Sequence, residues 1–307
     1  MTRRLLFAGV GLILWGSISL ALYLVVMNIS TPPNTPDTTT ASGIPLSKED
    51  TVYVGVVSRF APNLIYEGYQ PIVDYLTERT PYFFILKLSN SYEETIQQLV
   101  RGEVQLAFVG TFVYLKARGH YPIRCILRPL NRQHQPCFRS VLITRTDSPI
   151  QSVTDLRAKR LAVPSPMSFS ANWILRAELP RHGVQSSALA EVRHFDFHHT
   201  VAYEVLSGRY DAGVVKDRVA EEFSDKGIRI VLASPPIPGS PLIVRKDLDT
   251  SFVQAIRQAL LSVDTRKQEY QQLVSNWDAE FVYGFAVAED NDYDYADTLL
   301  TVPGDDL

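Results

Sequence analysis

Hydroxyl side chains gather at one junction of the sequence, in the stretch SPMSFSAN at Ser165–Asn172. It follows the apolar run Leu161–Pro164 and carries no charge, which is typical of a buried strand that passes into a helix. Hydroxyls and the unpaired backbone N–H groups of a helix start are suited to binding an anion. The same groups also cap ordinary helices, so Ser168 and Ser170 are either an anion site or only a helix cap.

A second group of residues that could bind a ligand or a metal lies in the stretch HFDFHHT, which contains His194, His198 and His199. On a helix His194 and His198 would share one face, which raises the question of zinc. Val192–Phe197 looks extended, however, and this would place His194, Asp196 and His198 on one strand face instead. The sequence offers no fourth ligand nearby, so we expect no metal. We expect His198 to donate a hydrogen bond to an anion, and His199 to cap a helix or face solvent. A site that requires protonated His198 would bind in a pH-dependent way.

Signatures of catalysis are missing from the sequence. It has no Gly-x-Ser-x-Gly elbow, phosphate-binding loop or dinucleotide fingerprint, and its acids Glu204, Asp211 and Asp217 show no pairing. We therefore expect a protein that is not an enzyme and uses no cofactor.

Predicted strands and helices alternate along the chain, which indicates parallel strands in an α/β architecture. The segment TIQQLVRGEVQLAFVG at Thr95–Gly110 resembles VAYEVLSGRYDAGVVK at Val201–Lys216: a helix, a glycine cap and a short strand. Ser91 and Glu94 form a capping box before the first of these helices. The predicted strands of both halves are Thr51–Ser58, Phe83–Leu88, Gln105–Gly110, Ser140–Arg145, Arg160–Pro164, Glu191–Phe195 and Tyr210–Val215.

The repeated pattern predicts two lobes that face each other. We expect residues 51–139 and 235–295 to form a discontinuous first lobe, and residues 140–234 to form a second lobe inserted into it. Two connections between the lobes would make a hinge that closes around a ligand. Ligands of open α/β sheets bind at the carboxyl ends of strands. These ends are Ser58-Arg59, Gly110-Thr111, Ser165–Ser170 and Lys216-Asp217.

Composition is ordinary for a globular body: 46% of the 307 residues are hydrophobic and 21% are charged. The formal net charge of −3 provides no basic field for nucleic acid, so we expect no nucleic-acid partner. The two cysteines, Cys125 and Cys137, lie in strand-like flanks that could form a ladder. A disulfide between them and two unpaired thiols both remain open, because sequence does not give the separation of the residues.

The N-terminal residues 1–28 differ from the rest. Arg3 and Arg4 precede the uncharged run Leu5–Met27, whose 23 residues are enough to span a bilayer. We interpret this run as an uncleaved transmembrane helix that places the body on the periplasmic side of the cytoplasmic membrane. A long signal peptide that is removed is the alternative, and it would release the protein into the periplasm. Residues 29–50 are rich in Pro, Thr and Ser and should form a flexible linker, and residues 296–307 a C-terminal tail.

The ordered set of segments resembles the phosphonate-binding PhnD-like family, which comprises periplasmic solute-binding proteins of type II fold. The resemblance extends from Thr51 to Tyr295. The segments that carry it are TVYVGVVS, EETIQQLVRGEVQLAFVGTFVYLKA, FRSVLITRTDSPIQSVTDLRAKRLAVPSPMSFSAN, FDFHHTVAYEVLSGRYDAGVV, ASPPIPGSPLIVRKDL and GFAVAEDNDYDYA.

The resemblance also implies a set of ligand-binding residues. The family's Ser-x-Ser turn falls on Ser168 and Ser170, with the ring of Phe169 between them, and the family's histidine falls on His198. Further positions match the family less closely. These are the stretch after the third strand with Thr111 and Tyr114, an aromatic of the first loop at Tyr69, and Asp217 near the pocket. Arg59 is inferred as an anion partner only because it lies at the end of the first strand.

The resemblance implies a binding protein for a small phosphate-like oxyanion (phosphonate, phosphite or phosphate) that delivers it to an ABC importer. Differential affinity of the closed state for the ligand is the expected mechanism. A membrane-tethered sensor that reports the same anion to a signalling partner is the alternative.

Overall fold

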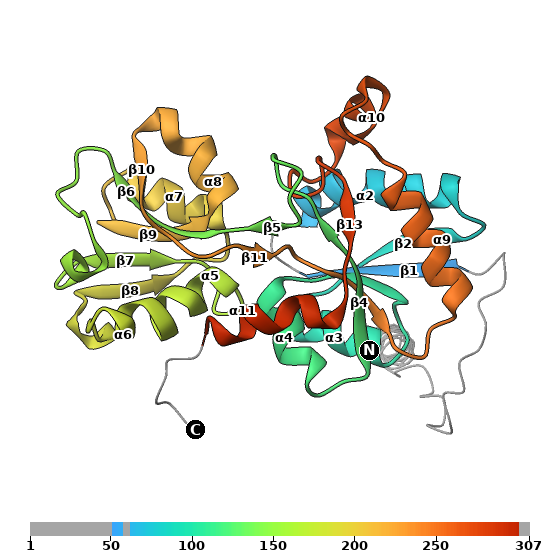
Figure 1. The fold of residues 1–307 in the computed structure, drawn as a ribbon, viewed down its shortest axis with the longest axis horizontal. Helices are drawn as coiled ribbons and strands as arrows, with labels where there is room; N and C mark the ends of the chain where they lie inside the picture. The colour runs from blue at the N-terminus through green and yellow to red at the C-terminus, as the bar shows by residue number, and fades with distance from the viewer. Residues whose placement is uncertain (1–50, 58–61, 301–307) are drawn as a thin grey trace, which may run out of the picture. The chain divides into compact units, whose positions relative to one another are not determined.

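The structure is a computed structural model that describes residues 51–57 and 62–300. These residues belong to one unit, residues 43–307, and form two sheets that are joined by a pair of short strands (Figure 1). The two-lobed α/β fold that the sequence predicts is therefore confirmed.

The first sheet has six strands in the order β13-β4-β12-β3-β1-β2. Strand β1 lies parallel to β2 and β3, as expected from the helices between them, whereas β12 is antiparallel to both β3 and β4. The chain thus returns late to place a strand in the middle of this sheet. The strand bounds are β1 Thr51–Val56, β2 Phe83–Leu88, β3 Leu106–Phe108, β4 Ile123–Pro129, β12 Leu242–Arg245 and β13 Phe285–Val287.

The second sheet has five strands in the order β10-β6-β9-β7-β8. Strand β7 is parallel to β8 and β9, and β6 is antiparallel to β9 and β10. All strands of this sheet come from the inserted part of the chain. Their bounds are β6 Ser140–Arg145, β7 Arg160–Val163, β8 Glu191–His194, β9 Ala212–Lys216 and β10 Ile228–Ala233.

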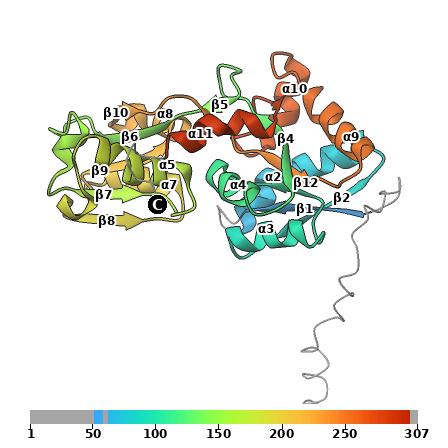
Figure 2. The same cartoon turned by 60° about the horizontal axis from the view of Figure 1, so that its bottom comes forward.

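Successive side chains of a strand point to opposite faces of the sheet, and each face packs against its own set of helices. In β3, Leu106 and Phe108 join the core of α2 (Pro62–Arg79) and α9 (Thr250–Leu261), and Ala107 faces the core of α3 (Tyr92–Val100) and α4 (Thr111–Arg118). The second sheet is covered on one face by α7 (His198–Leu206) and α8 (Asp217–Phe223). Its other face packs against α5 (Phe169–Asn172), the π-turn η2 (Trp173–Glu178) and α6 (Leu179–Arg181). Figure 2 shows these layers from a second side.

Two short strands connect the sheets. Strand β5 (Cys137–Phe138) runs antiparallel to β11 (Ile237–Pro238) and pairs with it between the lobes. The hydroxyl of Tyr293 donates to the carbonyl of Gly239, just after β11, at 2.8 Å. Helix α11 (Asp294–Thr298) packs against β11. The two connections between the lobes are thereby held to each other and to the C-terminal segment.

Some element bounds differ from those that the sequence suggests. Helix α2 begins at Pro62, where proline at a first helical position loses no hydrogen bond. The segment expected as a tail from residue 296 starts inside α11, and Leu299 and Leu300 beyond it are buried. Helix α10 comprises Gln268–Leu273. The remaining short helices are η1 Val153–Leu156, η3 Ser186–Ala188, η4 Ser224–Lys226, η5 Val274–Asn276 and η6 Asp290–Tyr293.

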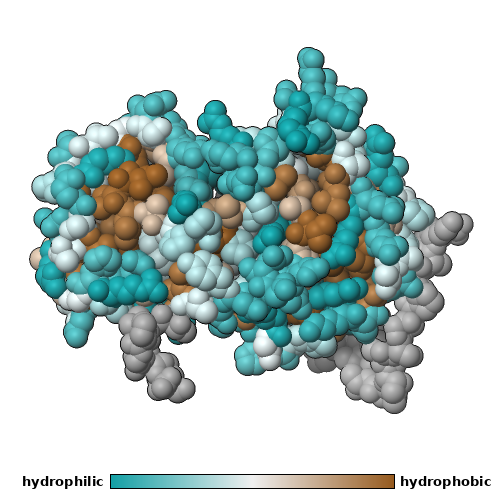
Figure 3. Space-filling model, viewed as in Figure 1, coloured by the Kyte–Doolittle hydropathy of each residue, from teal (hydrophilic) through white to brown (hydrophobic). Residues whose placement is uncertain are grey.

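The surface view of the same face shows a patch of apolar side chains on each lobe within a largely hydrophilic surface (Figure 3). Among residues 51–57 and 62–300, no helix has the length and apolarity that a membrane span needs. The predicted transmembrane run at Leu5–Met27 and the linker at residues 29–50 lie outside the described residues.

Candidate functional site

A small pocket lies where strands of both sheets end. Its volume is about 70 Å³, room for about five water molecules or one small ion. Strand ends of the first sheet contribute Val57, Gly110 and Thr111, and those of the second contribute Pro164, Ser165 and Lys216, in agreement with the rule for open α/β sheets. The residues that line it are Val57, Tyr92, Gly110, Thr111, Phe138, Pro164, Ser165, Met167, Ser168, Phe169, Ser170, Asp196, His198, His199, Lys216, Arg218, Val219, Ser240 and Glu280.

Ser168 lies at the wall of this pocket and also caps a helix. It is the N-cap of α5, with extended backbone angles, and its Oγ accepts from the N–H of Ser170 at 3.2 Å. The helix that it opens runs on through η2 and α6 to Arg181. The helix-cap interpretation of this serine is therefore confirmed. The serine also places a hydroxyl and the positive end of the helix dipole at the pocket, and its binding of an anion stays a prediction.

Ser170 is fully buried, and its Oγ lies 2.8 Å from the Oγ of Ser140 at the start of β6. This contact holds the start of α5 against the second sheet. Phe169, between the two serines, is buried and packs edge-on against Phe138 of β5, with ring centroids 6.4 Å apart. The aromatic ring beside the site thus packs against the strand that connects the lobes.

His198 is the first residue of α7, and backbone geometry fixes its tautomer. The N–H of Lys216 donates to its Nδ1 at 3.2 Å, so that in the neutral ring the hydrogen lies on Nε2. Nε2 is 3.3 Å from the Oγ of Ser168 and donates to it. Because Ser168 Oγ already accepts from Ser170 N–H, its own O–H is left to act as a donor.

The charge state of His198 differs from the protonated form considered from the sequence. Burial, together with the positive charges of Lys216 and Arg218, holds the pKa of His198 well below its usual range. The neutral ring is the form that these surroundings favour, so its contribution to the site is a hydrogen bond rather than a charge. The extended face shared by His194 and His198 is also wrong, because β8 ends at His194 and α7 begins at His198.

Lys216, at the carboxyl end of β9, brings a cation to the pocket. Its Nζ lies 2.6 Å from Glu280 Oε1 and donates to the Oγ of Ser240 at 3.2 Å. It also lies over the ring of Phe138, 4.7 Å from its centroid. Lys216 belongs to the second lobe, whereas Glu280 and Ser240 precede strands β13 and β12 of the first sheet. This ion pair therefore bridges the lobes at the pocket.

The outer side of the pocket carries further charge. Arg218 pairs with Glu222 at 2.6 Å, and Nε2 of His199 lies 2.8 Å from the same carboxylate. This contact holds His199 against α8. The side chain is partly exposed, and the sequence analysis expected it to cap a helix or face solvent.

Three of the residues expected at the site lie elsewhere. Tyr69 packs edge-on against Phe108 and Phe281 in the core of the first lobe. Tyr114 is fully buried and donates its O–H to Asp290.

Asp217, the third, turns away from the pocket to a structural role. Its carboxylate accepts from the backbone N–H of Arg139 and from that of Arg218, each at 2.9 Å. It lines a separate, larger pocket of about 290 Å³.

Thr111 does reach the pocket, as the first residue of α4. It is buried, and its Oγ1 donates to the carbonyl of Pro238 in β11 at 3.0 Å. Arg59 falls in residues 58–61 and lies outside the described residues. The residues that the sequence analysis missed are Lys216, Ser240, Glu280 and Arg218. Lys216 was marked only as a strand end, and the partners of its charge come from distant segments that carry no local pattern.

The two cysteines are free thiols, so the disulfide that the sequence allowed is not formed. Cys125 lies in β4, which pairs with β12 and β13, and Cys137 lies in β5, which pairs with β11. The expected ladder between their flanks therefore does not exist. Within the part of the chain that the structure describes, no group of three or more His, Cys, Asp or Glu side chains could hold a metal ion.

Comparison with protein families gives a decisive match. Residues 54–293 match the model of the periplasmic substrate-binding protein of ABC phosphonate transporters. The chain belongs to this family. Among curated proteins, the phosphate-import protein PhnD of Mycolicibacterium smegmatis is 22% identical over 293 residues, which cover 88% of this chain and 89% of that protein.

Solved structures show the same fold. A binding protein component of an ABC phosphonate transporter from Pseudomonas aeruginosa has a TM-score of 0.69 at 17% identity, covering 81% of this chain and 85% of that one. PhnD1 from Prochlorococcus marinus in complex with methylphosphonate has a TM-score of 0.68 at 16% identity, covering 81% and 96%. The chain is thus a phosphonate-transporter substrate-binding protein by family, with the two-lobed α/β periplasmic-binding-protein fold of its structural relatives.

Proposed function

We propose that this substrate-binding protein holds a small phosphate-like oxyanion (phosphonate, phosphite or phosphate) in the pocket between its lobes and delivers it to the permease of an ABC importer. The observation that carries the proposal is the convergence of donors on one small cavity. The O–H of Ser168, the helix starts at Ser168 and His198, and the ammonium of Lys216 all meet there. Such a set suits tetrahedral oxygen atoms.

Size supports a small ligand. A volume of about 70 Å³ accommodates an ion of a few heavy atoms rather than a sugar or a nucleotide. Two of the relatives are associated with ligands in this range, since one is named for phosphate import and another was solved with methylphosphonate.

The mechanism is binding coupled to closure, with no bond broken. Thr111, Ser240 and Glu280 come from the first lobe and the segments that lead into it, and Ser168 and His198 come from the second. A ligand that contacts both groups stabilises the closed arrangement by its higher affinity for that state. The permease then receives the closed form.

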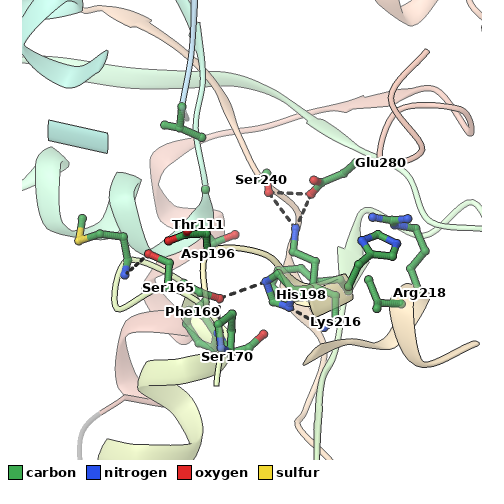
Figure 4. Close-up of a pocket in the computed structure, with 18 of the residues that line it drawn as sticks. Thr111, Ser165, Phe169, Ser170, Asp196, His198, Lys216, Arg218, Ser240 and Glu280 are labelled. Atoms are coloured by element: carbon green, nitrogen blue, oxygen red, sulfur yellow. Dashed lines mark hydrogen bonds and ion pairs between the residues drawn. The ribbon is translucent and has the colours of Figure 1, made fainter. Parts of the chain in front are cut away.

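Most of the donors in the pocket are neutral, which favours release of the anion. Ser168 and the backbone N–H groups of the helix starts carry no permanent charge, and His198 in its neutral form adds none. The ammonium of Lys216 is already paired with the carboxylate of Glu280 (Figure 4). We propose Arg59 as a further partner of the anion at the end of β1.

Membrane attachment by Leu5–Met27 completes the proposal, with the folded body on the periplasmic side. Cell fractionation after alkaline extraction checks this part. A protein that keeps its N-terminal residues and stays with the membrane supports the anchor, and a mature chain that begins after residue 28 and is soluble contradicts it.

The pocket is tested by ligand-induced stabilisation. Phosphate, phosphite and methylphosphonate are each added to the purified protein, because a ligand present at about 100 times its Kd adds about 2.7 kcal/mol to the stability. We expect at least one of them to raise the Tm, and the double variant Ser168→Ala/Ser170→Ala to lose this rise.

The matched control is Ser186→Ala/Ser187→Ala, which removes two exposed hydroxyls of the same lobe outside the pocket. It should keep the full rise in Tm. A rise that persists in the pocket variant shows that the anion binds elsewhere.

A further inference from the structure

Three large apolar side chains lie exposed and adjacent on one face of the first sheet. Phe83 and Ile85 of β2 are 55% and 37% exposed, and Tyr53 of β1 is 39% exposed. The strand register pairs Tyr53 with Ile85 and Thr51 with Phe83, so the three side chains are neighbours on the same face. We call them the Tyr53 patch. Apolar residues that are exposed singly are common, whereas a contiguous group indicates an interaction surface.

The patch is exposed because a helix covers only part of this face. On the opposite face the 18-residue helix α2 packs against both strands, and the alternate residues of β1 and β2 are buried there. On the patch face the nine-residue helix α3 packs on β1, β3 and β12, toward the middle of the sheet. Strand β2 is at the edge of the sheet, so Phe83 and Ile85 stay uncovered.

The chain enters the folded body beside this patch. Thr51, the first residue of β1, is the register partner of Phe83. The residues that precede it include the run Leu5–Met27, which we propose as a membrane span. Even in an extended polyproline conformation, at about 3.1 Å per residue, residues 29–50 would keep Thr51 within about 70 Å of the bilayer. The tether thus gives the patch a high effective concentration at the membrane, and a weak contact is enough for docking.

The chemistry of the patch suits the boundary between lipid headgroups and acyl chains. Aromatic rings with aliphatic neighbours are typical of protein surfaces at this depth. The other residues that β1 and β2 present on this face are Thr51, Gly55 and Lys87, none of which is acidic. The ammonium of Lys87 lies 6.0 Å from the centroid of the Tyr53 ring, at the border of the patch. The carboxylate of Glu103 is paired with Lys87 at 3.0 Å, which reduces its repulsion of anionic lipids.

The patch faces the side on which the two lobes open. Figure 2 shows α3, which lies on the patch face, at the lower border of the first lobe, and β5 of the hinge at the upper border. Lobes joined by a hinge open on the side away from their connections. Docking through this face would therefore turn the opening toward the bilayer, where a permease lies.

We infer that the Tyr53 patch docks the folded body on the lipid bilayer at the level of the headgroups. The inference rests on the proposed membrane attachment and adds a second contact with the membrane, made by the body itself. A second copy of this chain or another protein is a different occupant of the same surface, and the test separates these from lipid.

The test uses the full-length protein in vesicles of phosphatidylethanolamine and phosphatidylglycerol, with or without bromine on the acyl chains. Bromine quenches indole fluorescence on close contact, so an indole in the patch reports contact with lipid. We expect brominated lipid to lower the emission that Phe83→Trp adds to wild type by about twofold or more. The matched control is Tyr203→Trp in α7 of the second lobe, because Tyr203 is also 55% exposed. Its added emission should not change.

A further variant tests whether the apolar residues cause the docking. Tyr53→Thr and Ile85→Thr, added to Phe83→Trp, remove apolar area but keep β-branched side chains that suit a strand. We expect the quenching of the added indole to be lost. Quenching that persists, or equal quenching in Tyr203→Trp, shows contact without a role for the patch and overturns the inference.

The wild-type protein reports membrane attachment separately. Trp15 lies within Leu5–Met27, whereas Trp173 and Trp277 are buried in the folded body. Brominated lipid should therefore quench part of the wild-type emission. Wild-type emission without quenching overturns the proposed attachment, and the inference falls with it.

Two results overturn the inference and leave the attachment in place. In the first, wild-type emission is quenched and the indole added by Phe83→Trp is neither quenched nor shifted, which shows that the patch stays in water. In the second, the added emission shifts to the blue without quenching, which shows that protein covers the patch.

Discussion

The backbone N–H of Lys216 donates to Nδ1 of His198 at 3.2 Å, and this bond can form only while Nδ1 carries no hydrogen. The end of β9 therefore holds the first residue of α7 in one tautomer. Burial and the nearby cations act in the same direction, since they hold the pKa of His198 well below its usual range.

The first prediction concerns stability in acid. Below about pH 6.5 an unfolded chain takes up a proton on this histidine, whereas the folded protein keeps it neutral. The unfolded state thus binds more protons, and the free energy of unfolding falls as the pH falls, by up to about 1.4 kcal/mol per pH unit from this group. His198→Asn keeps an acceptor for Lys216 N–H and removes the titration, so it should lose less stability than wild type between pH 7 and pH 5. Urea unfolding at each pH measures this, and parallel profiles for the two proteins would contradict it.

The second prediction is that Asp217 stabilises the fold and does not bind the anion. Desolvation raises the pKa of this carboxyl group, while its two backbone hydrogen bonds join the start of β6 to the start of α8. Asp217→Ala leaves those two N–H groups without their acceptor, and we expect a loss of about 1–3 kcal/mol in the free energy of unfolding. Anion affinity, measured by calorimetry on the folded variant, should stay within threefold of wild type. A loss of binding without a loss of stability would restore the ligand role suggested by the sequence.

Local pattern was enough to predict most of the fold. The two helix–glycine–strand units were recognised from sequence, and their glycines Gly102 and Gly208 adopt the left-handed φ values of +75° and +74° that such caps need. The strand ends that meet at the pocket also followed from pattern, because parallel strands in one sheet end on the same side.

Long-range partners could not be predicted in this way. Lys216 acquires its role from Glu280, which is 64 residues away, and no local spacing connects them. Tyr69 illustrates the opposite error: the family resemblance placed it in a loop at the site, whereas it lies inside helix α2. Burial against Phe108 and Phe281 decides for the core, and burial is a property of the assembled fold.

The third prediction concerns the thiols. Cys125 is buried, and burial raises the pKa of its thiol to about 12, so very little thiolate is present at neutral pH. We expect native protein treated with iodoacetamide to remain unmodified at Cys125, and denatured protein to take up two labels. Intact mass spectrometry without reductant should give the mass of two free thiols. A mass lower by two hydrogens would show a disulfide.

The fourth prediction concerns the packing of the helix that carries His198. A Cβ atom on Gly213 of β9 would lie 2.7 Å from a methyl carbon of Val201 and 2.7 Å from one of Val205, both in α7. Gly213→Ala should therefore push α7 outward, with a cost of about 1–3 kcal/mol and weaker anion binding. Gly119→Ala is the control, since its Cβ meets nothing within 4 Å. Equal stability of the two variants would show that α7 accommodates the methyl group without moving.

The fifth prediction tests a helix cap away from the pocket. Ser91 Oγ accepts from Glu94 N–H at 3.1 Å, and the Glu94 carboxylate accepts from Asn90 N–H at 2.6 Å. Ser91→Ala should lower the free energy of unfolding by about 1 kcal/mol, and Ser91→Asp should retain most of it. Anion affinity should be unchanged in both, as calorimetry can verify.

The order of strands in the first sheet also bears on how the chain matures. Strand β12 lies between β3 and β4, yet it is made more than a hundred residues after them, so the first lobe lacks an interior strand until residues 242–245 have emerged. The second lobe is continuous, and its two ends meet where Ser234 N–H donates to the carbonyl of Ser140 at 2.8 Å. The inserted lobe can thus be complete first, whereas the sheet of the first lobe stays unfinished until the last fifth of the polypeptide is present.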